Sequence, residues 1–399
     1  MRSQQQATAL VSNGPASSGE WKIENVSLRA LKDDELLVRI VACGICLADV
    51  HFGDVAKEDA KDNPMIFYPR VLGHEGSGYV EQVGKGVTTA NPGDPVILSY
   101  MSCGKCYTCK DGHPAYCVDL MPLNFVGEDV YISDSSPTHS IGGQFFGQSS
   151  FASRTLVKER AVINLRGIVD NEDELKLLSP LGCGVQTGSG TMINIGGASK
   201  GDEVAVLGVG GVGLSAIMGA TLQGCKTIIA IDRVQSRLEL AKELGATHTI
   251  NTASPSVDLV SEVLKATNGV GVRISLDTTG VQSLARQSFD FVRCHGRILQ
   301  NGLAKPEDNW DVPMAALMNS GKQILGAVQG DAVPQDYIPK MIKWYREGRF
   351  PVNKLIKFYA LEDFQQALED MKSGRTVKPV LVFPHQPADI GRTKQGAML

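Results

Sequence analysis

The sequence has no cluster of basic residues and no long apolar run. Its 39 Lys and Arg are interspersed with 43 Asp and Glu, and the formal net charge of the 399 residues is −4. Nucleic acids and anionic membranes attract clustered positive charge, so neither is an expected partner. No stretch approaches the roughly 20 apolar residues of a membrane-spanning helix, and the first twenty residues lack the apolar core of a signal peptide. We therefore expect a cytoplasmic protein whose partners are neither nucleic acids nor membranes.

The cysteines are few and unevenly placed. There are nine, an odd number that does not suit a closed disulfide framework, and thiols stay reduced in the cytosol. Four of them fall within CGKCYTCKDGHPAYC (103–117), where chance, disulfides or a metal could explain the clustering. Closely spaced reduced thiols on a glycine-rich loop favour a structural zinc ion closed by four thiolates. The ligands would be Cys103, Cys106, Cys109 and Cys117.

The chain changes character at about residue 185. Before that point, apolar alternation interrupted by Gly and Pro predicts strands at 7–13, 21–28, 35–45, 76–84 and 94–100. Beyond it, strand and helix alternate at 202–208, 211–224, 227–232 and 236–246, with later strands at 273–280, 296–302 and 322–328. This alternation predicts a parallel sheet with right-handed crossovers. From 329 onward helix and strand are mixed, and residues 384–399 are expected to form a loose tail.

The motif GVGGVG (208–213) predicts a dinucleotide site because it follows a predicted strand and opens a predicted helix. The first glycine would allow a tight turn, the second a close approach of the backbone to a pyrophosphate, and the last close helix–strand packing. The start of the helix would then offer free N–H groups to the phosphates. The residues predicted to contact the cofactor here are Gly208, Gly210, Gly211, Val212 and Gly213.

An acidic residue, Asp232, lies nineteen positions after the last glycine, at the end of the next predicted strand. Its carboxylate would accept hydrogen bonds from the adenosine ribose and repel a 2′-phosphate, which favours NAD over NADP. Arg233 follows directly and would either offset that repulsion or remain a solvated charge.

Three further residues stand out by their surroundings, although no local spacing joins them. Cys46 lies in CGICLADVH (43–51), His74 in LGHEGSG (72–78), and Cys183 in LGCGVQTG (181–188). Together with the cysteine-rich segment and VLGVGGVG through Asp232, these motifs occur in an order that resembles the zinc-dependent medium-chain alcohol dehydrogenases, loosely the aryl- or benzyl-alcohol type. The resemblance covers residues 8 to 383.

The resemblance implies a GroES-like β-rich catalytic domain at 1–185 and 329–399, and a doubly wound Rossmann NAD-binding domain at 186–328. By the same resemblance, Cys46, His74 and Cys183 hold a catalytic zinc ion whose fourth position is open to substrate. The zinc would act as a Lewis acid on an alcohol hydroxyl while a hydride passes to NAD. With the four-thiolate site, two zinc ions per chain are expected.

Further roles follow from the same resemblance. Asp49 would orient His74, and Glu75 would lie behind the metal as a further potential ligand. Around the cofactor, Thr187 would pack near the nicotinamide, Arg237 near the ribose and Lys378 near the pyrophosphate, with surface charge as the alternative interpretation of the last two. The substrate pocket would be lined by Ser99, Tyr100, Phe146 and Leu303. Relatives form dimers or tetramers through the nucleotide domain, and a homodimer is expected here.

The sequence departs from the family pattern at three places. Ala48 stands where a Ser or Thr usually begins a proton relay that ends at the histidine matching His51. Water could bridge the gap, Glu75 or a pocket residue could serve, or the reaction could need no proton at that oxygen. Leu47 replaces a basic residue that touches the pyrophosphate in many relatives. The segment 53–71 is longer than usual, and it would either cover the pocket entrance or be a tolerated surface insertion.

Three functions are compatible with these residues. The first is a zinc-dependent, NAD-dependent oxidoreductase of an alcohol or aldehyde, aromatic or otherwise apolar. The second is a reductase of a conjugated C=C or C=N bond, which Ala48 would suit. The third is a zinc- and NAD-binding protein with a structural or sensing role, against which the open metal site argues.

Overall fold

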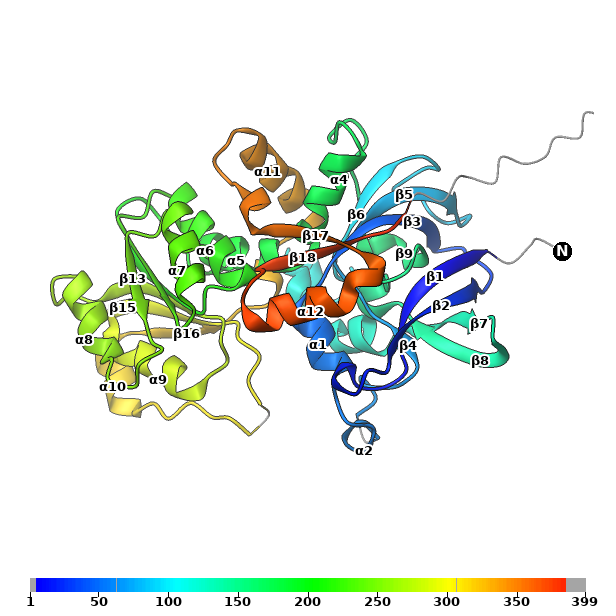
Figure 1. Cartoon of the computed structure of the whole chain (residues 1–399). Coiled ribbons are helices and arrows are strands. Elements are labelled where there is room, and N and C mark those ends of the chain that lie inside the picture. Colours follow the sequence, from blue (N-terminus) through cyan, green and yellow to red (C-terminus); the bar gives the residue numbers. More distant parts are fainter. Residues whose placement is uncertain (1–4, 62, 306, 385–399) are drawn as a thin grey trace, which may run out of the picture.

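The computed structural model describes residues 5–61, 63–305 and 307–384. The chain forms a β-rich lobe, at the right of Figure 1, and a lobe with a parallel sheet, at the left. The tail expected at 384–399 lies outside the described residues except for Pro384. Within the described ranges, no helix has the length and apolar character needed to cross a membrane.

The β-rich lobe contains a closed barrel and a seven-stranded sheet. The barrel strands, in order of pairing, are β1 (Gln6–Ser12), β2 (Trp21–Leu28), β7 (Glu128–Ser133), β8 (Ser136–Gly143) and β4 (Arg70–Val71). The sheet runs β10 (Val162–Asn164), β6 (Pro95–Leu98), β5 (Gly76–Val83), β3 (Glu35–Gly44), β18 (Lys378–Val382) and β17 (Ile356–Ala360), with β9 (Arg154–Lys158) pairing β3. Because β18 pairs with β3, the C-terminal segment returns to the lobe that the N-terminal segment builds.

The second lobe is a six-stranded parallel sheet in the order β13 (His248–Asn251), β12 (Thr227–Asp232), β11 (Glu203–Leu207), β14 (Val272–Asp277), β15 (Val292–Gln300) and β16 (Gln323–Gly326). Relative to chain order this is 3-2-1-4-5-6, the arrangement of dinucleotide-binding folds. The helices between the strands are α6 (Gly211–Leu222), α7 (Gln235–Glu243), α8 (Leu259–Ala266), α9 (Gln282–Phe291) and α10 (Met314–Ser320).

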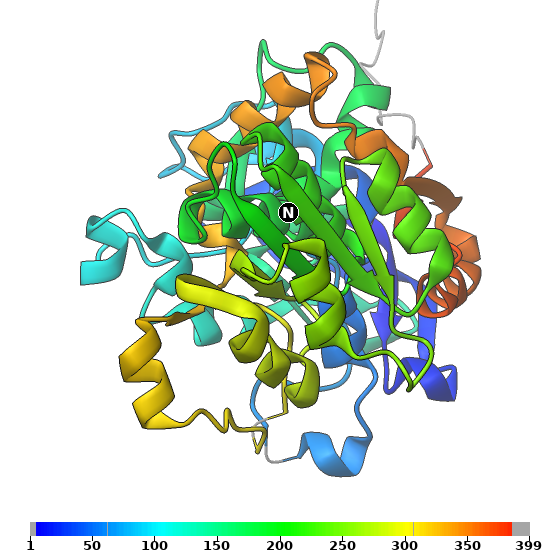
Figure 2. The ribbon, with the colours of Figure 1, turned by 90° about the vertical axis from the view of Figure 1, so that its left-hand side faces the viewer.

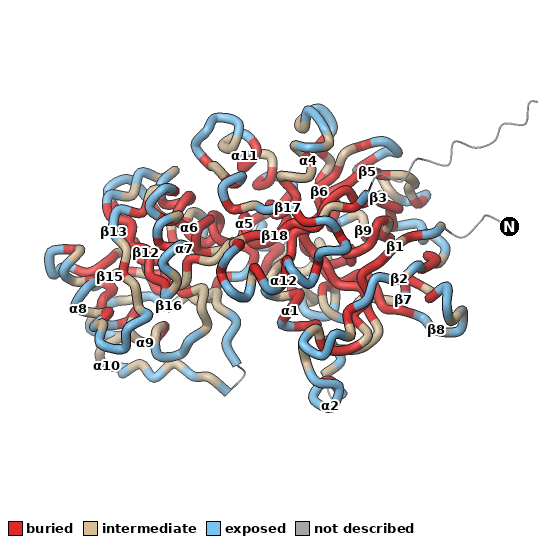
Figure 3. Tube along the Cα trace, in the orientation of Figure 1, coloured by how far each residue is buried: buried red, intermediate tan, exposed pale blue. Residues whose placement is uncertain are grey.

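Strand β11 shows why this sheet must be covered on both faces. Val204 and Val206 belong to one hydrophobic core, whereas Ala205 and Leu207 belong to another on the opposite face. Successive side chains of a strand point to opposite faces, so an unbroken apolar run requires helices on both sides. The apolar run at 202–208 predicted a buried strand, and residues 204–207 are fully buried, as is the neighbouring β12 in Figure 3.

Helix α5 (Gly184–Gly190) lies where the two lobes meet (Figure 1), and Figure 2 shows the molecule from the side of the parallel-sheet lobe. A Cβ added at Gly188 would lie 1.9 Å from the carbonyl oxygen of Val212 in α6. Only a glycine permits this close approach, so the segment after Cys183 packs tightly against α6, the helix that begins within the GVGGVG motif. The remaining helices are α1 (Leu47–Gly53), α2 (Lys57–Ala60), α3 (Tyr107–Lys110), α4 (Glu172–Leu178), α11 (Pro334–Arg346) and α12 (Phe364–Ser373).

Candidate catalytic metal site and cofactor loop

Residues from three separate segments converge at the junction of the lobes. Cys46 lies between β3 and α1, His74 lies between β4 and β5, and Cys183 immediately precedes α5. One potential ligand atom of each of these residues and of Glu75 lies within 4.8 Å of the others. The structure thus brings together the three residues that the family resemblance assigned to the catalytic zinc.

The imidazole of His74 is oriented by Asp49. Its Nδ1 lies 2.9 Å from Asp49 Oδ1, which also accepts the N–H of Gly73 at 3.0 Å, while Asp49 Oδ2 accepts the N–H of Cys46 at 2.9 Å. The carboxylate fixes the proton on Nδ1, so the lone pair of Nε2 faces the two thiols. His74 Nε2 is buried and has no hydrogen-bond partner among the described residues. A cation bound between this nitrogen and the two thiols would supply the partner that it lacks.

The donor set fits zinc. Two sulfur atoms and one imidazole nitrogen are the ligands of the alcohol dehydrogenase type of catalytic zinc site, and the fourth position stays open. A hydrogen bond from Cys183, together with the nearby positive charge of Lys378, holds the pKa of the Cys46 thiol well below its ordinary value despite burial. Cys46 is therefore prepared to bind as a thiolate.

Glu75 and Lys378 form a buried ion pair behind this site. The Lys378 ammonium lies 2.9 Å from each carboxylate oxygen of Glu75 and also donates to the carbonyl of Ile45. Burial raises the pKa of Glu75, and the lysine opposes this rise. The Lys378 side chain also passes Gly211, where an added Cβ would lie 3.4 Å from its Cε. Lys378, which was expected at the pyrophosphate, therefore connects the start of α6 with the carboxylate of Glu75 behind the candidate metal site.

A strained turn supports His74 from the other side. Phe146 has a φ of +55°, a left-handed conformation that is costly for an aromatic residue. Its ring stacks on the His74 imidazole with centroids 4.3 Å apart and an interplanar angle of 18°. Gln144 and Ser149 in the same turn also have positive φ values. The strain is compensated by packing, since Phe145 and Phe146 are both buried.

Ala48 occupies the position at which relatives carry the relay hydroxyl. Ala48 packs against the core of the β-rich lobe, Leu47 is 63 % exposed, and His51 is exposed with its ring edge-on to Phe52 at 5.1 Å. Ala48 supplies no hydroxyl between the metal site and His51. The three proton routes suggested by the sequence therefore remain open predictions.

The four clustered cysteines also converge. The sulfur atoms of Cys103, Cys106, Cys109 and Cys117 lie within 4.8 Å of one another, and all four thiols are free. The Cys106 and Cys117 sulfurs are 4.0 Å apart, close to the roughly 3.8 Å edge of a zinc tetrathiolate with bonds of about 2.3 Å. Hydrogen bonds from the Thr108 hydroxyl and from backbone N–H groups lower the pKa of Cys106 to about 5. The segment is suited to a closed metal site.

The GVGGVG loop has the geometry that its sequence predicts. Gly208 has a φ of +82°, and a Cβ at Gly213 would lie 1.9 Å from the carbonyl oxygen of Gly208. A Cβ at Gly210, in contrast, would meet no atom within 4 Å. The fold itself does not require glycine at 210, so the open space in front of it is available to a ligand. The first and last glycines serve the turn and the packing, as predicted.

Asp232 is fixed beside this loop. Its Oδ2 accepts the N–H of Val209 at 2.8 Å and its Oδ1 accepts the N–H of Val234 at 2.9 Å. Arg233 is exposed, whereas the Arg237 guanidinium lies against the carbonyl of Met371 at 3.5 Å. Arg237 thus reaches toward α12 of the other lobe.

The side chains expected around substrate and nicotinamide are not all free. Ser99 donates to the carbonyl of Gly182 at 2.6 Å, and Tyr100 donates to the carbonyl of Ala332 at 2.6 Å. Thr187 donates to the carbonyl of Cys183 at 2.8 Å, and Leu303 is 53 % exposed. Among the predicted pocket residues, Phe146 directly contacts a metal-ligand candidate.

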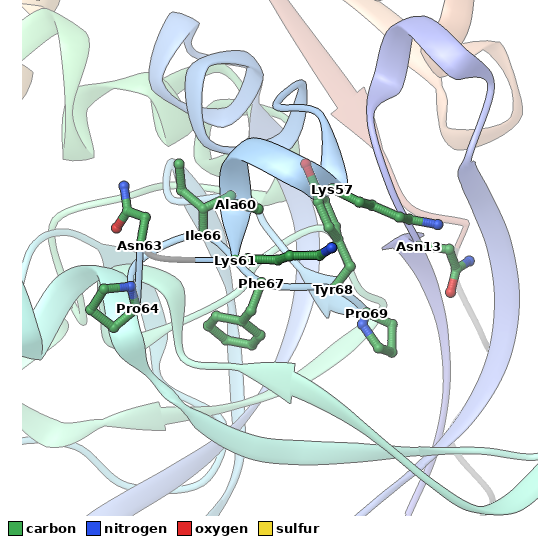
Figure 4. A pocket seen from close by; sticks show the side chains of 10 residues that line it. All are labelled: Asn13, Lys57, Ala60, Lys61, Asn63, Pro64, Ile66, Phe67, Tyr68 and Pro69. Carbon is green, nitrogen blue, oxygen red and sulfur yellow. The ribbon is translucent and has the colours of Figure 1, made fainter.

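The long segment 53–71 forms a pocket of its own, shown in Figure 4. Its volume is about 550 Å³, and its lining includes Lys61, Phe67 and Tyr68 but none of the metal-ligand candidates. Arg70, which is buried, donates to the carbonyls of Met65 and Phe125. Its guanidinium also lies over the rings of Phe67 and Phe145. Arg70 thereby ties this segment to the turn that supports His74.

Two glutamines near the metal site were not predicted from the sequence. Gln148 Nε2 donates to the carbonyls of His74 and Ser99, and Gln329 Nε2 lies 3.7 Å from the Cys183 sulfur. Neither residue belongs to a recognisable local motif. The FFGQSS segment did contain a signal, since its Gly is followed by polar residues that suit a tight turn.

Comparison with known proteins agrees with this architecture. Residues 32–167 match the family described as the alcohol dehydrogenase GroES-like domain, and residues 211–347 match the zinc-binding dehydrogenase family. A geraniol dehydrogenase from Castellaniella defragrans is 38 % identical over 369 residues, which is 92 % of this chain and 95 % of that protein. The chain belongs to the zinc-binding alcohol dehydrogenases, with a GroES-like and a Rossmann-like domain, and is an alcohol dehydrogenase by class.

Two solved structures are similar over almost the whole chain. A zinc-binding-domain alcohol dehydrogenase from Burkholderia ambifaria is 40 % identical with a TM-score of 0.87, covering 96 % of this chain and 100 % of that one. The benzyl alcohol dehydrogenase of Acinetobacter calcoaceticus is 37 % identical with a TM-score of 0.85, covering 95 % of this chain and 100 % of that one. These relatives have the names of alcohol dehydrogenases, which does not favour the alternative of a C=C or C=N reductase.

Proposed function

We propose that this alcohol dehydrogenase interconverts an aromatic or otherwise apolar alcohol and its aldehyde, using NAD(H) and one catalytic zinc ion. The observation that carries the proposal is His74 Nε2, which has no hydrogen-bond partner among the described residues and lies close to the thiols of Cys46 and Cys183. Cys183 directly precedes α5, and α5 packs tightly against α6, the helix of the predicted cofactor-binding segment. Cys46, His74 and Cys183 would hold the zinc. When bound, zinc lowers the pKa of an alcohol hydroxyl and NAD accepts the hydride.

The surrounding residues have defined tasks in this proposal. Asp49 keeps the proton on His74 Nδ1, so that Nε2 remains a ligand. Lys378 neutralises Glu75 behind the metal, which limits the negative charge near two thiolates. The phenylalanines around His74 exclude water from its ring faces, which strengthens the electrostatic interactions of the site.

The choice of NAD is supported by Asp232. Two backbone N–H groups occupy only part of its accepting capacity, and the remaining lone pairs suit the ribose hydroxyls. A 2′-phosphate would meet this carboxylate and be repelled. Arg233 points away into solvent in this proposal and does not offset the repulsion.

The substrate class is supported by an aromatic cluster beside the metal site, made of Phe52, Phe125, Phe145 and Phe146. Phe52 stacks on Phe125 at 4.5 Å, and Phe125 meets Phe146 edge-on at 5.1 Å. Aromatic walls favour flat or branched apolar substrates. The names of the relatives, geraniol and benzyl alcohol dehydrogenase, point to the same class of alcohol.

A second zinc ion would fill the closed site of Cys103, Cys106, Cys109 and Cys117 and stabilise its segment.

We further propose a homodimer formed through the nucleotide-binding lobe, with a homotetramer as the alternative. Strand β16 lies at the edge of the parallel sheet, and Met314 and Met318 on the neighbouring α10 are 88 % and 75 % exposed. We also propose a cytoplasmic location, which is supported by nine free thiols in the described chain.

The test of the function is hydride transfer monitored at NADH with aryl and terpenoid alcohols, their aldehydes and the matching conjugated enals. Carbonyl reduction without saturation of the alkene supports the proposal. Saturation of the alkene would instead support the reductase alternative, and inactivity on every substrate would support a non-catalytic role.

The metal assignment is tested separately with Cys183→Ala. This variant should lose turnover and one zinc per chain while NADH binding stays measurable. Cys225→Ala, which removes a cysteine that belongs to neither cluster, is the control. Normal activity of the Cys183 variant would contradict the assignment.

A further inference from the structure

The turn Gln329–Asp331 approaches the catalytic metal site in an unusual backbone conformation. Its three residues have φ values of +50°, +67° and +45°, and two of the three are not glycine. Non-glycine residues rarely adopt this conformation, and they persist in it where the surroundings hold them. Gln329 is 8 % exposed, so its polar side chain is directed into the protein.

The side-chain amide of Gln329 is oriented by a hydrogen-bond chain. The carbonyl of Gly182 can only accept, so Gln186 must present its Nε2 to it, at 2.8 Å. Gln186 Nε2 also lies 2.8 Å from the Ser99 hydroxyl and 3.0 Å from the Gln329 amide, and Gln329 can present only its oxygen Oε1 to this amide nitrogen. The Nε2 of Gln329 is then left to face the Cys183 sulfur at 3.7 Å. The direction of this amide follows from the backbone carbonyl at the end of the chain.

The backbone of the turn is held against α5. A Cβ added at Gly330 would lie 2.5 Å from the carbonyl oxygen of Gln186, and one added at Gly190 would lie 2.7 Å from the carbonyl oxygen of Gly330. Asn194 donates to the Gly330 carbonyl at 2.9 Å. The turn thus sits directly on the helix that begins after Cys183.

The cysteine lobe, defined here as residues 103–117, holds the turn from its outer side. His113 Nδ1 lies 2.7 Å from Asp331 Oδ2, and the Tyr116 hydroxyl donates to the carbonyl of Gly326 at 2.8 Å. Both residues lie between Cys109 and Cys117, so a metal bound by the four cysteines would fix their positions.

We propose that Gln329 is a positioning residue for Cys183, and that the cysteine lobe acts on the catalytic site by holding Gln329 in place. This inference rests on the proposed catalytic zinc. The amide N–H donates to the thiolate, which stabilises its negative charge, restrains its rotamer and moderates its donation to the metal. The lobe thereby has a second task beyond its own folding, because it fixes a turn that the sheet alone would not hold in a left-handed conformation.

The first experiment compares the variants Gln329→Met and Gln329→Asn in the full-length protein with cobalt in the catalytic site. Met keeps the length but cannot donate, and Asn suits the left-handed backbone but does not reach the sulfur. Both should move the thiolate-to-cobalt absorption band to longer wavelength, because a thiolate without a hydrogen bond gives up an electron more easily. Both should also release the metal to a chelator about 10-fold faster, because the Cys183 side chain is no longer restrained in its ligand rotamer and this loss outweighs the stronger donation of the free thiolate. Gln287→Met, at a half-buried position of α9 in the other lobe, is the matched control and should behave as the wild type.

The second experiment tests the lobe with His113→Ala and Tyr116→Phe, and with His248→Ala as the control for loss of an exposed histidine. Both lobe variants should retain the lobe zinc and shift the cobalt band in the same direction as Gln329→Met, by a smaller amount. An unchanged band and release rate in both Gln329 variants would overturn the positioning role. A shift in the Gln329 variants without one in the lobe variants would overturn the role of the lobe. A wild-type protein without cobalt–thiolate absorption would instead refute the catalytic metal site itself.

Discussion

At the scale of single residues, Asp49 determines which ring nitrogen of His74 carries the proton. Its carboxylate receives the His74 Nδ1–H and two backbone N–H groups while being completely buried. Asp49→Asn removes the charge that stabilises this tautomer and places an amide where acceptors are needed. We expect catalytic zinc affinity to fall 10- to 100-fold, measured by competition with a chelator.

The control for Asp49 is Asp173→Asn, which alters a carboxylate that is 95 % exposed on α4. The lobe zinc should remain bound in both variants. Equal affinity of Asp49→Asn and wild type for the catalytic metal would mean that the imidazole needs no carboxylate to hold it.

Glu35 is a buried carboxylate whose charge stabilises the β-rich lobe. Burial would raise its pKa, but hydrogen bonds from Arg29 at 2.8 Å, the Lys32 N–H at 3.0 Å and Gln144 at 2.7 Å, together with the Lys158 ammonium at 3.0 Å, lower the pKa to about 2. Because this value lies below the ordinary 4.5, the stabilisation is complete above pH 4.5 and is lost as the pH falls toward 2. The lowered pKa corresponds to about 3 kcal/mol.

Glu35→Gln should therefore flatten the acid limb of stability. Thermal midpoints measured from pH 6 to pH 3 should fall more steeply in the wild type than in the variant, and the two should converge at low pH. Parallel curves for wild type and Glu35→Gln would show that another carboxylate is responsible. Since Gln144 belongs to the turn beside His74, the variant also tests whether that turn depends on this ion cluster.

At the scale of elements, the GVGGVG loop separates two uses of glycine. Gly213→Ala would place a methyl group 1.9 Å from the carbonyl oxygen of Gly208, so it should lower the thermal midpoint of the cofactor-free protein by several degrees. Gly210→Ala meets no protein atom within 4 Å and should leave that midpoint nearly unchanged. Its methyl group would stand where the pyrophosphate approaches, so NADH affinity should fall at least 10-fold, as measured by fluorescence.

The two variants control for each other, because they add the same methyl group three residues apart. Loss of NADH affinity in Gly213→Ala alone, with a normal Gly210→Ala, would mean that the cofactor does not approach the loop at Gly210.

Several elements could be predicted from the sequence because local pattern determines them. The strand expected at 227–232 is β12 (Thr227–Asp232), and the helix expected at 211–224 is α6 (Gly211–Leu222). Their apolar runs and glycines have the same meaning in any context. The turns at 144–149 and Gln329–Asp331 could not be predicted, since their left-handed residues are held by distant partners such as His74 and the cysteine lobe.

At the scale of the whole molecule, β16 is one of the two edge strands of the parallel sheet, so one side of it has no partner strand among the described residues. Ile324 on this strand is 37 % exposed, and Met314 and Met318 on the preceding helix α10 are also exposed. An unpaired edge with apolar neighbours is a surface for a second copy. Ile324→Lys should shift the protein from dimer to monomer in sedimentation velocity, while Val270→Lys, at an exposed apolar position after α8, should not.

If the proposed dimer does not use this edge, Ile324→Lys will sediment as the wild type does. A tetramer that falls to a dimer in the same variant would instead indicate that β16 forms one of two interfaces.

The sequence by itself determined the alternation of strands and helices, the glycine loop with its acidic partner, and the closely spaced cysteines, because each is a property of neighbouring residues. Tertiary structure decided the rest. Cys46, His74 and Cys183 are separated by 28 and 109 positions and meet only because β3, the segment before β5 and α5 converge between two lobes. The contact of Gln329 with Cys183 likewise depends on a turn that is held by hydrogen bonds to Asn194 and His113. These partners are distant in the sequence, so no local pattern encodes the contact.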